Sequence, residues 1–471
     1  MDDTFGIEYT PTALKSSSWD ENALSQIEYV YLYWVDLGNT RRCRVIPVDH
    51  FKALLRSKRP AVGIGKVGLG LVYLMTANGF TGIGEYLYTL DTSSFRVLHG
   101  VGEGDKPVGA LFGYFQEKAA NPTNGVRVNL CPRTVLCGLE RELETKHSAS
   151  FLIGFESEFI LLKSTSPVTP SNVHQWSASA AILRSSPESR CMHAIAQALK
   201  ASGIPLQMYH AEAAPGQYEV VSNPLTPLAA ADALVLTREV ITHTAASFGL
   251  HATFAPRPFM YSAGSSTHAH ISVHNPPNLG TKIPNQLSNY EEAFLAGILD
   301  HLSAIAALTL PTPASYKRVA DGVWSGGTYV SYGTENREAP VRLTNAASPA
   351  SRNFELRFID GTANPYLALA AVLAAGMIGI SGKKKLEMQD LKESSAAEMS
   401  DAGRREAGIT KRLPSSAKEA RENLQRDQIL VSTLGGDLVD AFLAVSEKLE
   451  EALNPEGEDD DQLLTRLVEF Y

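Results

Sequence analysis

Cysteine is scarce in this chain and basic residues are outnumbered by acidic ones, which excludes several classes of protein. The 471 residues include four cysteines, Cys43, Cys131, Cys137 and Cys191. They are neither dense enough for a disulfide scaffold nor paired at the short spacings of a zinc site. With 42 basic and 51 acidic residues, the net charge of -9 offers no general attraction to nucleic acid or to anionic membranes. We therefore expect a protein of a reducing compartment, the cytoplasm, with no nucleic-acid partner.

Secretory and membrane-spanning signals are also missing. The start, Met1 to Gly6, lacks the basic residues and the apolar stretch of a secretory signal, and we expect no run long enough to span a bilayer. The most apolar stretch, Leu367 to Ile380, is rich in alanine and leucine and follows Asn364-Pro365. It is typical of a buried helix whose small side chains permit close packing. We expect no membrane partner.

The length and the local patterns predict one small and one large domain. Residues Glu28 to Pro47 mix aromatic and β-branched residues around the turn Asp36 to Asn39, which predicts two antiparallel strands joined by a hairpin. The polar stretch Glu117 to Gly125 has the composition of a linker. We therefore predict a β-rich domain over residues 1–125 and a second domain over residues 126–471.

Strand-like and helix-like patterns alternate in the second domain, which predicts a mixed α/β fold. The predicted strands are Phe151–Leu162 and Ser266–His274, and the predicted helices are Pro227–Phe248 and Tyr366–Ile380. The charged segment Lys383–Arg412 has few large apolar residues and is expected to lie on the surface.

Five short motifs hold the residues that can do chemistry. Together with Arg318 they supply six candidate metal ligands and four arginines, the apparatus for moving a phosphoryl group onto a carboxylate. The motifs are Gly154–Phe159, His210–Glu219, Gly264–His270, Asn336–Arg342 and Phe354–Asp360.

The first motif places two carboxylates side by side. In a strand, residues two apart share a face, so Glu156 and Glu158 point the same way among apolar residues. Burying adjacent anions is costly or forces one to take up a proton, unless cations neutralise them. Divalent ions would do so, although such a pair on one strand face more often faces solvent.

The same alternation applies to the later motifs. His268, His270 and Ser272 share one strand face, as do Glu355 and Arg357, and we expect these polar faces to converge in a barrel-like sheet. A Pro-Gly turn brings Glu212 and Glu219 towards one pocket. Five carboxylates and one imidazole form an oxygen-rich set that suits Mg²⁺ or Mn²⁺ better than zinc or copper.

In order and residue type, the five motifs resemble the catalytic core of the glutamine synthetase family, and the resemblance runs from about Tyr31 to near the C-terminus. It implies an α+β fold, with a small N-terminal β-grasp domain followed by a large catalytic α/β domain with a curved antiparallel sheet. It also implies ATP as co-substrate, a small carboxylic acid and an amine as the other substrates, and a homo-oligomeric ring, a decamer or dodecamer, with active sites between subunits.

The resemblance further implies roles for individual residues. Glu158, Glu212 and Glu219 would hold one metal, and Glu156, His268 and Glu355 a second. His270 and Ser272 match residues near the nucleotide phosphates.

Four arginines, Arg318, Arg337, Arg342 and Arg357, match the family's arginines for substrate carboxylate and phosphate. Guanidinium suits that task because it pairs bidentately with planar oxyanions, whereas the commoner fate of an arginine is a surface ion pair. The resemblance implies catalytic roles for Arg318, Arg337 and Arg357, and phosphate contacts for Arg337 and Arg342. It implies substrate contacts for Gly264, Arg318, Trp324 and Arg357. Arg352 could also reach phosphate, on a poorer match.

Several positions depart from the family pattern. Trp324 stands where glutamine synthetases place the glutamate that takes a proton from ammonium, and residues 66–79 offer no counterpart to a second carboxylate. Ala263 replaces an asparagine that contacts glutamate, and Asn353 stands where a basic residue often lies near the nucleotide. Asp321 could act as a displaced base. A site that exchanges anions for tryptophan no longer selects ammonium, so a larger or aromatic amine is favoured.

These departures resemble those of fungal glutamine synthetase-like proteins related to the FluG developmental regulator, and three hypotheses follow. The first is an ATP-dependent ligase that activates a carboxylate as an acyl phosphate and joins it to an amine other than ammonia. The second is ordinary glutamine synthetase activity with an altered base. The third is a catalytically idle structural or regulatory assembly.

Overall fold

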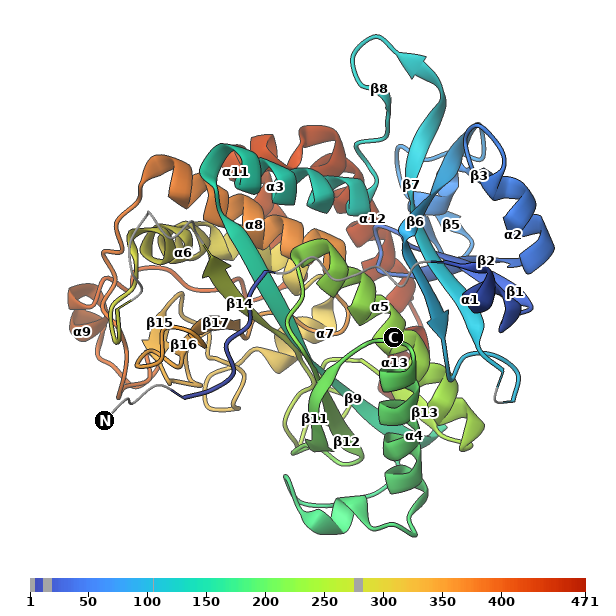
Figure 1. Ribbon diagram of the computed structural model, residues 1–471. Coiled ribbons are helices and arrows are strands. Elements are labelled where there is room, and N and C mark those ends of the chain that lie inside the picture. The colour runs from blue at the N-terminus through green and yellow to red at the C-terminus, as the bar shows by residue number, and fades with distance from the viewer. Residues whose placement is uncertain (1–4, 12–18, 105, 275–282) are drawn as a thin grey trace.

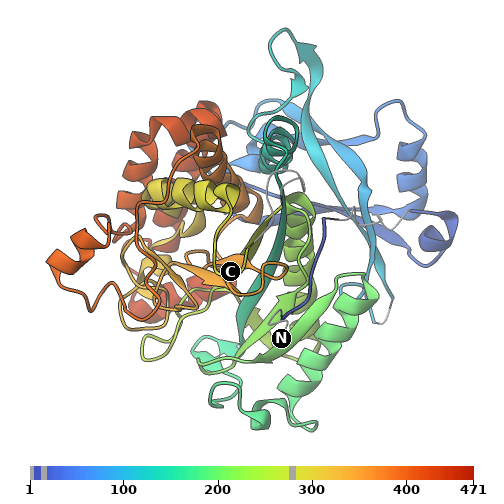
Figure 2. The ribbon, with the colours of Figure 1, turned by 60° about the vertical axis from the view of Figure 1, so that its left-hand side comes forward.

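The computed structural model describes residues 5–11, 19–104, 106–274 and 283–471. Residues 1–4, which belong to the stretch Met1 to Gly6 that was predicted to lack a secretory signal, lie outside the described residues. A small β-rich part lies beside a larger part in which helices cover a second sheet (Figure 1). Turned by 60°, the molecule shows the C-terminal helices on one side and the N-terminal sheet on the other (Figure 2).

The small part is built on one sheet with the strand order β2-β1-β7-β6-β3, and β8 adds to β7. The central pair β1 and β7 is parallel and the other pairs are antiparallel, which fits the expected β-grasp arrangement. The strands are β1 (Tyr29–Val35), β2 (Arg41–Pro47), β3 (Ala61–Gly65), β6 (Glu85–Leu98), β7 (Val108–Asn121) and β8 (Gly125–Arg127). The short helices α1 (Glu21–Ser25) and α2 (Val48–Leu55) and the hairpin β4 (Leu71–Val72) and β5 (Met75–Thr76) complete it.

The predicted hairpin at Glu28 to Pro47 is confirmed, because β1 and β2 pair from Tyr29 opposite Pro47 to Val35 opposite Arg41. The predicted linker is wrong as a description of Glu117 to Gly125. These residues form the end of β7, the turn and the first residue of β8. Polar composition did not distinguish a solvent-exposed hairpin from a linker. The domain boundary after residue 125 stays a prediction.

The large part is built on a sheet with the order β11-β12-β9-β14-β17-β16-β15, to which β10 and β13 add at β9. All pairs are antiparallel except β15 with β16. The strands are β9 (Ser150–Thr165), β10 (Val168–Pro170), β11 (Leu206–Ala211), β12 (Gln217–Ser222), β13 (His251–Thr253), β14 (Thr267–His274), β15 (Tyr332–Thr334), β16 (Val341–Thr344) and β17 (Asn353–Leu356).

The helices of the large part pack on one another and on this sheet, and the predicted helices after Pro227 and Asn364 are confirmed. They are α3 (Pro132–His147), α4 (Pro187–Ala201), α5 (Pro227–Ser247), α6 (Asn289–Thr309), α7 (Pro313–Arg318), α8 (Pro365–Gly382), α9 (Asp401–Glu406), α10 (Ala417–Arg426), α11 (Gln428–Leu434), α12 (Gly436–Leu453) and α13 (Asp460–Phe470).

Two of these helices, α6 and α8, correct the expectation that no segment is long enough to span a bilayer. Both are long and apolar enough to do so, and the bent pair α11 and α12 passes the same test as one unit. In each of the two single helices, 83% of the most apolar window is buried inside the fold. Small residues allow this packing, since a Cβ added at Gly297 would meet the carbonyl oxygen of Ala375 at 2.2 Å. Their apolar surface is therefore used in the core.

A buried ion-pair network joins the small sheet to the helices. Arg133 of α3 donates to Asp232 of α5 at 3.0 and 2.8 Å and to Asp91 of β6 at 2.7 Å. The Tyr366 hydroxyl of α8 donates to Asp232 at 2.7 Å. One guanidinium therefore holds carboxylates from both parts of the chain, which fixes their relative position.

Candidate active site

The register of the second sheet places acidic and imidazole side chains directly opposite one another. Glu156 of β9 lies opposite His268 of β14, and His270 of β14 lies opposite Glu355 of β17. Opposed residues on one face have side chains that touch. His268 Nδ1 is 3.0 Å from Glu156 Oε2 and 3.6 Å from Glu355 Oε1, and His270 Nε2 is 3.0 Å from Glu156 Oε1. Glu156, His268 and Glu355 thus form one compact group whose possible ligand atoms all lie within 4.8 Å of one another.

A second group forms where β11 and β12 meet. The turn at Pro215-Gly216 returns the chain so that His210 lies opposite Glu219, and Glu212 stands at the start of the turn. His210 is 3.4 Å from Glu219 Oε1 and 3.6 Å from Glu212 Oε1. These three residues also fit a metal-binding group. Gly216 has φ of +68°, and a Cβ there would lie 2.6 Å from the Leu161 carbonyl oxygen, so the turn requires glycine.

Glu158 lies between the two groups but is held differently. It stands opposite Glu219 across β9 and β12 and is buried. Its carboxylate accepts hydrogen bonds from the Ser266 amide at 2.9 Å, from the Ser266 hydroxyl, and from Gln217 Nε2 at 2.8 Å. His210, rather than Glu158, completes the compact group with Glu212 and Glu219. The ligand role implied for Glu158 stays a prediction.

All six implied metal ligands and all four arginines line one cavity of about 510 Å³, together with Gly264 and Trp324. Segments far apart in sequence therefore meet there. Gly264 is needed at the wall, because a Cβ would lie 2.4 Å from Arg318 Cγ and 2.8 Å from the Pro256 carbonyl oxygen. His270 and Ser272 lie on the same face of β14 but do not line this cavity.

Two of the arginines flank the carboxylate of Glu355. Arg342 Nη1 donates to it at 2.9 Å, and Arg357 Nη1 donates to its other oxygen. Arg318 is buried and donates to the Arg357 carbonyl oxygen at 3.1 Å. Each of these three guanidinium groups keeps a buried Nε without a hydrogen-bond partner within the described structure. Arg337 lies at the exposed edge of the cavity. This is a concentration of positive charge fitted to oxyanions.

His270 and Ser272 of β14, the residues expected near the nucleotide phosphates, are hydrogen-bonded to other polar side chains. His270 Nδ1 pairs with Asn353 Oδ1 at 2.8 Å, and the Ser272 hydroxyl pairs with His274 Nε2 at 2.8 Å. Asn353 Nδ2 in turn donates to the Ser351 carbonyl oxygen at 3.0 Å. Asn353 thus orients His270. A basic residue at position 353 would instead repel His270 when the imidazole is protonated.

Burial and crowding raise pKa values in the second group. Burial, with Glu156 and Glu158 nearby, raises the pKa of Glu219 to about 8, and burial beside Glu158 raises that of Glu212 to about 7. A hydrogen bond to Glu219 raises the pKa of His210 to about 9. These groups hold protons near neutral pH because there are too few cations for the anions.

In the first group the acids are ionised instead. Burial opposes ionisation of Glu355, but Arg357 and His268 outweigh it and hold its pKa at about 2. Burial likewise opposes ionisation of Glu156, and His270 and His268 keep its pKa well below the usual range. Burial also disfavours the charged form of His270, yet Glu156 raises its pKa to about 9.

The residues fit a pair of oxygen-preferring dications. Two groups of carboxylates and imidazoles face one cavity, and the buried His268 Nε2 has no hydrogen-bond partner within the described structure. Dications would neutralise the clustered anions, and the donor set suits Mg²⁺ or Mn²⁺.

Binding of Mn²⁺ is expected to strengthen as the pH rises between about 6 and 9, because protons compete for the ligands. Glu212 and Glu219, with pKa values of about 7 and 8, bind metal only after losing protons. His210 beside them, with a pKa of about 9, repels a dication until it loses its own proton. Affinity should rise by about tenfold per pH unit for each proton released. Calorimetric titrations in buffers of different ionisation enthalpy measure both the affinity and the protons. An affinity that is flat over this range would contradict the assignment of these ligands.

The loop that carries Trp324 also contains Asp321, and its structure argues against the alternative in which Asp321 acts as the base. Asp321 Oδ1 accepts from the Thr328 amide at 2.8 Å and from the Thr328 hydroxyl at 2.9 Å, so this carboxylate closes the loop and does not line the cavity. Trp324 adopts φ of +58°, a rare conformation for an aromatic residue. Its carbonyl oxygen accepts a hydrogen bond from Arg357 Nη2 at 3.0 Å, and the residue is 69% exposed at the cavity.

Two residues at the site were missed by the sequence reasoning. His210 belongs to one of the five motifs, but no role was predicted for it from the sequence. Its position opposite Glu219 across the Pro-Gly turn is the signal that could have identified it. Trp176 also lines the cavity and donates its indole N–H to Glu212 Oε1 at 3.2 Å. It lies in an irregular loop where strand and helix periodicity give no signal.

Arg352 does not reach the site, which corrects the alternative role in phosphate binding. It is buried on the core side, where it donates to both carboxylate oxygens of Glu291 on α6, at 3.1 and 2.8 Å. Arg352 directly precedes β17, and continuing the alternation of that strand back by one residue places Arg352 on the face opposite Glu355.

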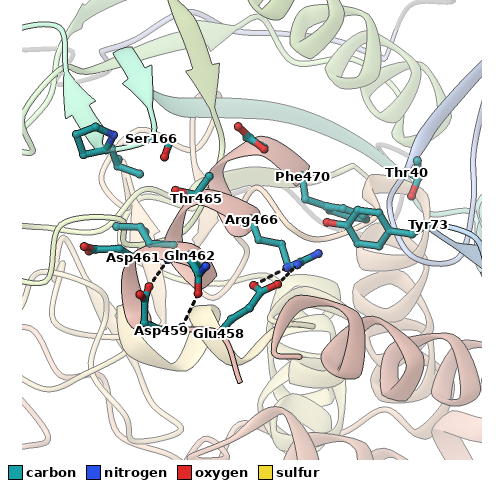
Figure 3. Close-up of a pocket in the computed structure, with 14 residues that line it drawn as sticks. Thr40, Tyr73, Ser166, Glu458, Asp459, Asp461, Gln462, Thr465, Arg466 and Phe470 are labelled. Atoms are coloured by element: carbon teal, nitrogen blue, oxygen red, sulfur yellow. Dashed lines mark hydrogen bonds and ion pairs between the residues drawn. The ribbon is translucent and has the colours of Figure 1, made fainter. Parts of the chain in front are cut away.

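A larger cavity of about 880 Å³ lies beside α13 and away from these groups (Figure 3). Several of its charged residues have structural partners: Arg466 pairs with Glu458, and the Asp459 side chain accepts from the Gln462 amide at 2.9 Å as the N-cap of α13. Neither metal-type group lies there. The smaller cavity is therefore the better candidate for chemistry.

Comparison with known proteins agrees with the geometry. The model of the glutamine synthetase catalytic domain matches residues 129–459. The chain is 34% identical to protein fluG of Emericella nidulans over 457 residues, which is 94% of this chain and 49% of that protein, so it spans about half of that relative. It is also 34% identical to gamma-glutamylpolyamine synthetase GlnA3 of Streptomyces coelicolor, over 74% of this chain and 73% of the relative.

The solved structures agree on the fold. A novel glutamine synthase homolog superimposes with a TM-score of 0.78 at 28% identity, covering 94% of this chain and 99% of the other. An ADP complex of GmaS superimposes with a TM-score of 0.75 at 24% identity, covering 90% and 93%. Glutamine synthetase-type proteins are ATP-dependent carbon–nitrogen ligases that use divalent metals and form oligomers. With its catalytic-domain match, its sheet and its cavity of carboxylates and arginines, the chain belongs to the glutamine synthetase family.

Proposed function

We propose that this protein is an ATP-dependent ligase that activates a small carboxylic acid as an acyl phosphate and joins it to an amine other than ammonia. The observation that carries the proposal is the convergence of two carboxylate–imidazole groups and four arginines on one cavity. A buried cluster of this kind is costly in an idle protein, because unneutralised anions are destabilising. An assembly without catalysis is therefore disfavoured.

The reaction needs two anions, the carboxylate and the γ-phosphate, to meet in line, and positive charge around the transferring group supplies most of the acceleration. Bound dications would polarise the phosphate oxygens and shield their charge. In our proposal Arg318 and Arg357 hold the substrate carboxylate, while Arg337 and Arg342 face the phosphate. The carboxylate oxygen bonds to phosphorus as ADP leaves. The neutral amine nitrogen then bonds to the carbonyl carbon as the carbon–oxygen bond to phosphate breaks, and the proton that the nitrogen loses leaves with the phosphate.

Metal assignments belong to the same proposal. Glu156, His268 and Glu355 would hold one ion, and Glu212, Glu219 and Glu158 another, with His210 beside the second. Mg²⁺ or Mn²⁺ is the proposed metal, and His270 and Ser272 are proposed to face the nucleotide phosphates.

Two exposed indoles support an amine larger than ammonia. Trp324 and Trp176 line the cavity with 69% and 63% of their surfaces exposed, so other groups can pack on them. Aromatic faces attract an ammonium that carries an organic substituent more than they attract a small, strongly hydrated ion. The similarity to a protein named gamma-glutamylpolyamine synthetase points the same way.

Cellular context follows from the same proposal. We place the enzyme in the cytoplasm, since its four cysteines are free thiols and suit a reducing compartment. A homo-oligomeric ring, decameric or dodecameric, is proposed from the family and is tested by mass measurement in solution.

Phosphate release from ATP, measured with Mg²⁺ across a panel of acids and amines, tests the function. Turnover with an organic amine supports our proposal, turnover with glutamate and ammonia alone supports an ordinary glutamine synthetase, and no turnover with any pair supports an idle assembly.

Replacing Trp324 with glutamate is expected to increase the use of ammonia, because the new carboxylate would attract ammonium into the cavity. The expected gain in kcat/KM for ammonium is at least about tenfold, within the range that electrostatic focusing provides. Steady-state kinetics with ammonium and with the best organic amine measure the change. Trp324→Phe is the control, since it keeps the aromatic face and should leave ammonium use low. No gain in Trp324→Glu would show that this position does not explain the choice of amine.

A further inference from the structure

The N-terminal residues Phe5 to Pro11, here named the N-terminal strap, are tied to the second sheet at two places. The Phe5 amide donates to Ser348 Oγ at 3.1 Å, and the hydroxyls of Ser348 and Ser351 donate to the Phe5 carbonyl oxygen at 2.6 and 2.7 Å. Further along, Gln207 Nε2 donates to the Tyr9 hydroxyl at 3.4 Å. Figure 1 shows the strap, in dark blue, passing across this part of the molecule.

The two attachment points lie on opposite sides of the sheet centre. Ser348 and Ser351 belong to the turn between β16 and β17, and Gln207 belongs to β11, so β12, β9 and β14 lie between them. Four strand spacings of about 4.8 Å amount to about 19 Å, which an extended segment of four or five residues spans with its side chains. The strap therefore crosses the strands that carry the candidate site.

The strap crosses next to the nucleotide end of the site. Ser351, which holds Phe5, accepts a hydrogen bond from Asn353 at 3.0 Å, and Asn353 pairs with His270 at 2.8 Å. His270 and Ser272, the residues proposed to face the phosphates, do not line the open cavity that the metal groups share. His270 and Ser272 are half-buried, and Asn353 links His270 to the turn that holds the strap.

The chemistry of the strap suits a displaceable cover more than a nucleotide ligand. Its sequence from Phe5 to Pro11 contains no lysine or arginine and one acid, Glu8, which would repel a triphosphate. Its large apolar side chains point outward, with Phe5 53% and Ile7 66% exposed. It is held by hydrogen bonds at the surface and not by a core, so it can leave without unfolding the domain.

We propose that the N-terminal strap closes the nucleotide end of the cleft and that binding of a nucleoside triphosphate displaces it. The inference rests on the proposed function, because that function assigns His270 and Ser272 to the nucleotide. A strap that covers the site most of the time weakens apparent nucleotide affinity by the fraction of molecules that are open.

The variant Gly6→Ala tests this without touching the candidate site. Gly6 has φ of +85°, and a Cβ there would lie 2.8 Å from Cβ and Oγ of Ser351, so alanine should push the strap off the turn. The matched control is Gly79→Ala, which has the same φ of +85° and nothing within 4 Å of the added Cβ. Binding of a non-hydrolysable ATP analogue with Mg²⁺ is measured by calorimetry, and hydrogen exchange of residues 5–11 is measured with and without the analogue.

Gly6→Ala is expected to bind the analogue about three- to tenfold more tightly than the wild type and Gly79→Ala, as release of a covered site predicts. In the wild type, exchange of the strap should become faster when the analogue binds. Equal or weaker binding by Gly6→Ala, or strap exchange that is unchanged or slower, would overturn the inference and leave the proposed function standing. Failure of all three proteins to bind the analogue would overturn the proposed function, and the strap inference with it.

Discussion

Glu355→Gln is expected to reduce turnover by about 10²–10³-fold, the loss typical of removing one electrostatic contact to a reacting centre. Glu355 contacts His268, Arg342 and Arg357 at once, so its charge supports both a metal group and two of the arginines. Glutamine keeps the shape and removes the charge. The measurements are phosphate release from ATP with the best acid and amine, and Mn²⁺ affinity by calorimetry, which should fall together.

The control for this variant is Glu188→Gln. Glu188 is a buried glutamate on α4 that does not line the candidate cavity. It should keep turnover and metal affinity close to the wild-type values. If Glu355→Gln turned over at the wild-type rate, Glu355 would have no part in the reaction.

Arg352→Met is expected to lower the free energy of unfolding by about 3–5 kcal/mol, because it removes one partner of a buried ion pair. Arg352 is 2% exposed, and its guanidinium makes a bidentate pair with Glu291, so methionine would leave the carboxylate in the core without this cation. Urea denaturation measures the change. Affinity for ATP in the folded variant should stay close to the wild-type value, because Arg352 faces the core.

The matched control is Arg426→Met. Arg426 pairs with Glu422 on the exposed surface of α10 at 3.0 Å, with 70% of its side chain exposed. Exposed pairs contribute about 0–1 kcal/mol, so this variant should unfold at nearly the wild-type urea concentration. Equal stability of both variants would refute the structural role of Arg352. Weaker ATP binding by folded Arg352→Met would restore its role at phosphate.

Local rules were sufficient for much of the fold. The hairpin around Asp36 to Asn39 was predictable because turn residues and strand alternation act over a few positions. The helix after Asn364 was predictable from its composition, but its full extent was not. The predicted run ended at Ile380, whereas α8 runs from Pro365 to Gly382 and is long enough to span a bilayer. Only its contacts with α6 show that this apolar surface belongs to the core.

The candidate site was predictable where strand alternation applies and unpredictable where contacts are long-range. Alternation placed Glu156 and Glu158 on one face, but the register that sets Glu156 opposite His268 depends on strands more than a hundred residues apart. Trp176 reaches Glu212 from an irregular loop that has no period to detect. Arg352 directly precedes β17, and extending the alternation of that strand by one residue would have placed Arg352 on the core side.

Carboxylates and imidazoles from separate segments gather in one cavity, where we propose that they bind paired dications. Calorimetric titration of the metal-free wild-type chain with Mn²⁺ measures this binding. We predict binding of two or more ions per chain with release of protons, since the pKa values of Glu212, Glu219 and His210 lie at about 7, 8 and 9. A titration that shows no Mn²⁺ binding at pH values above about 8, where Glu212 and Glu219 are largely ionised, would contradict the account.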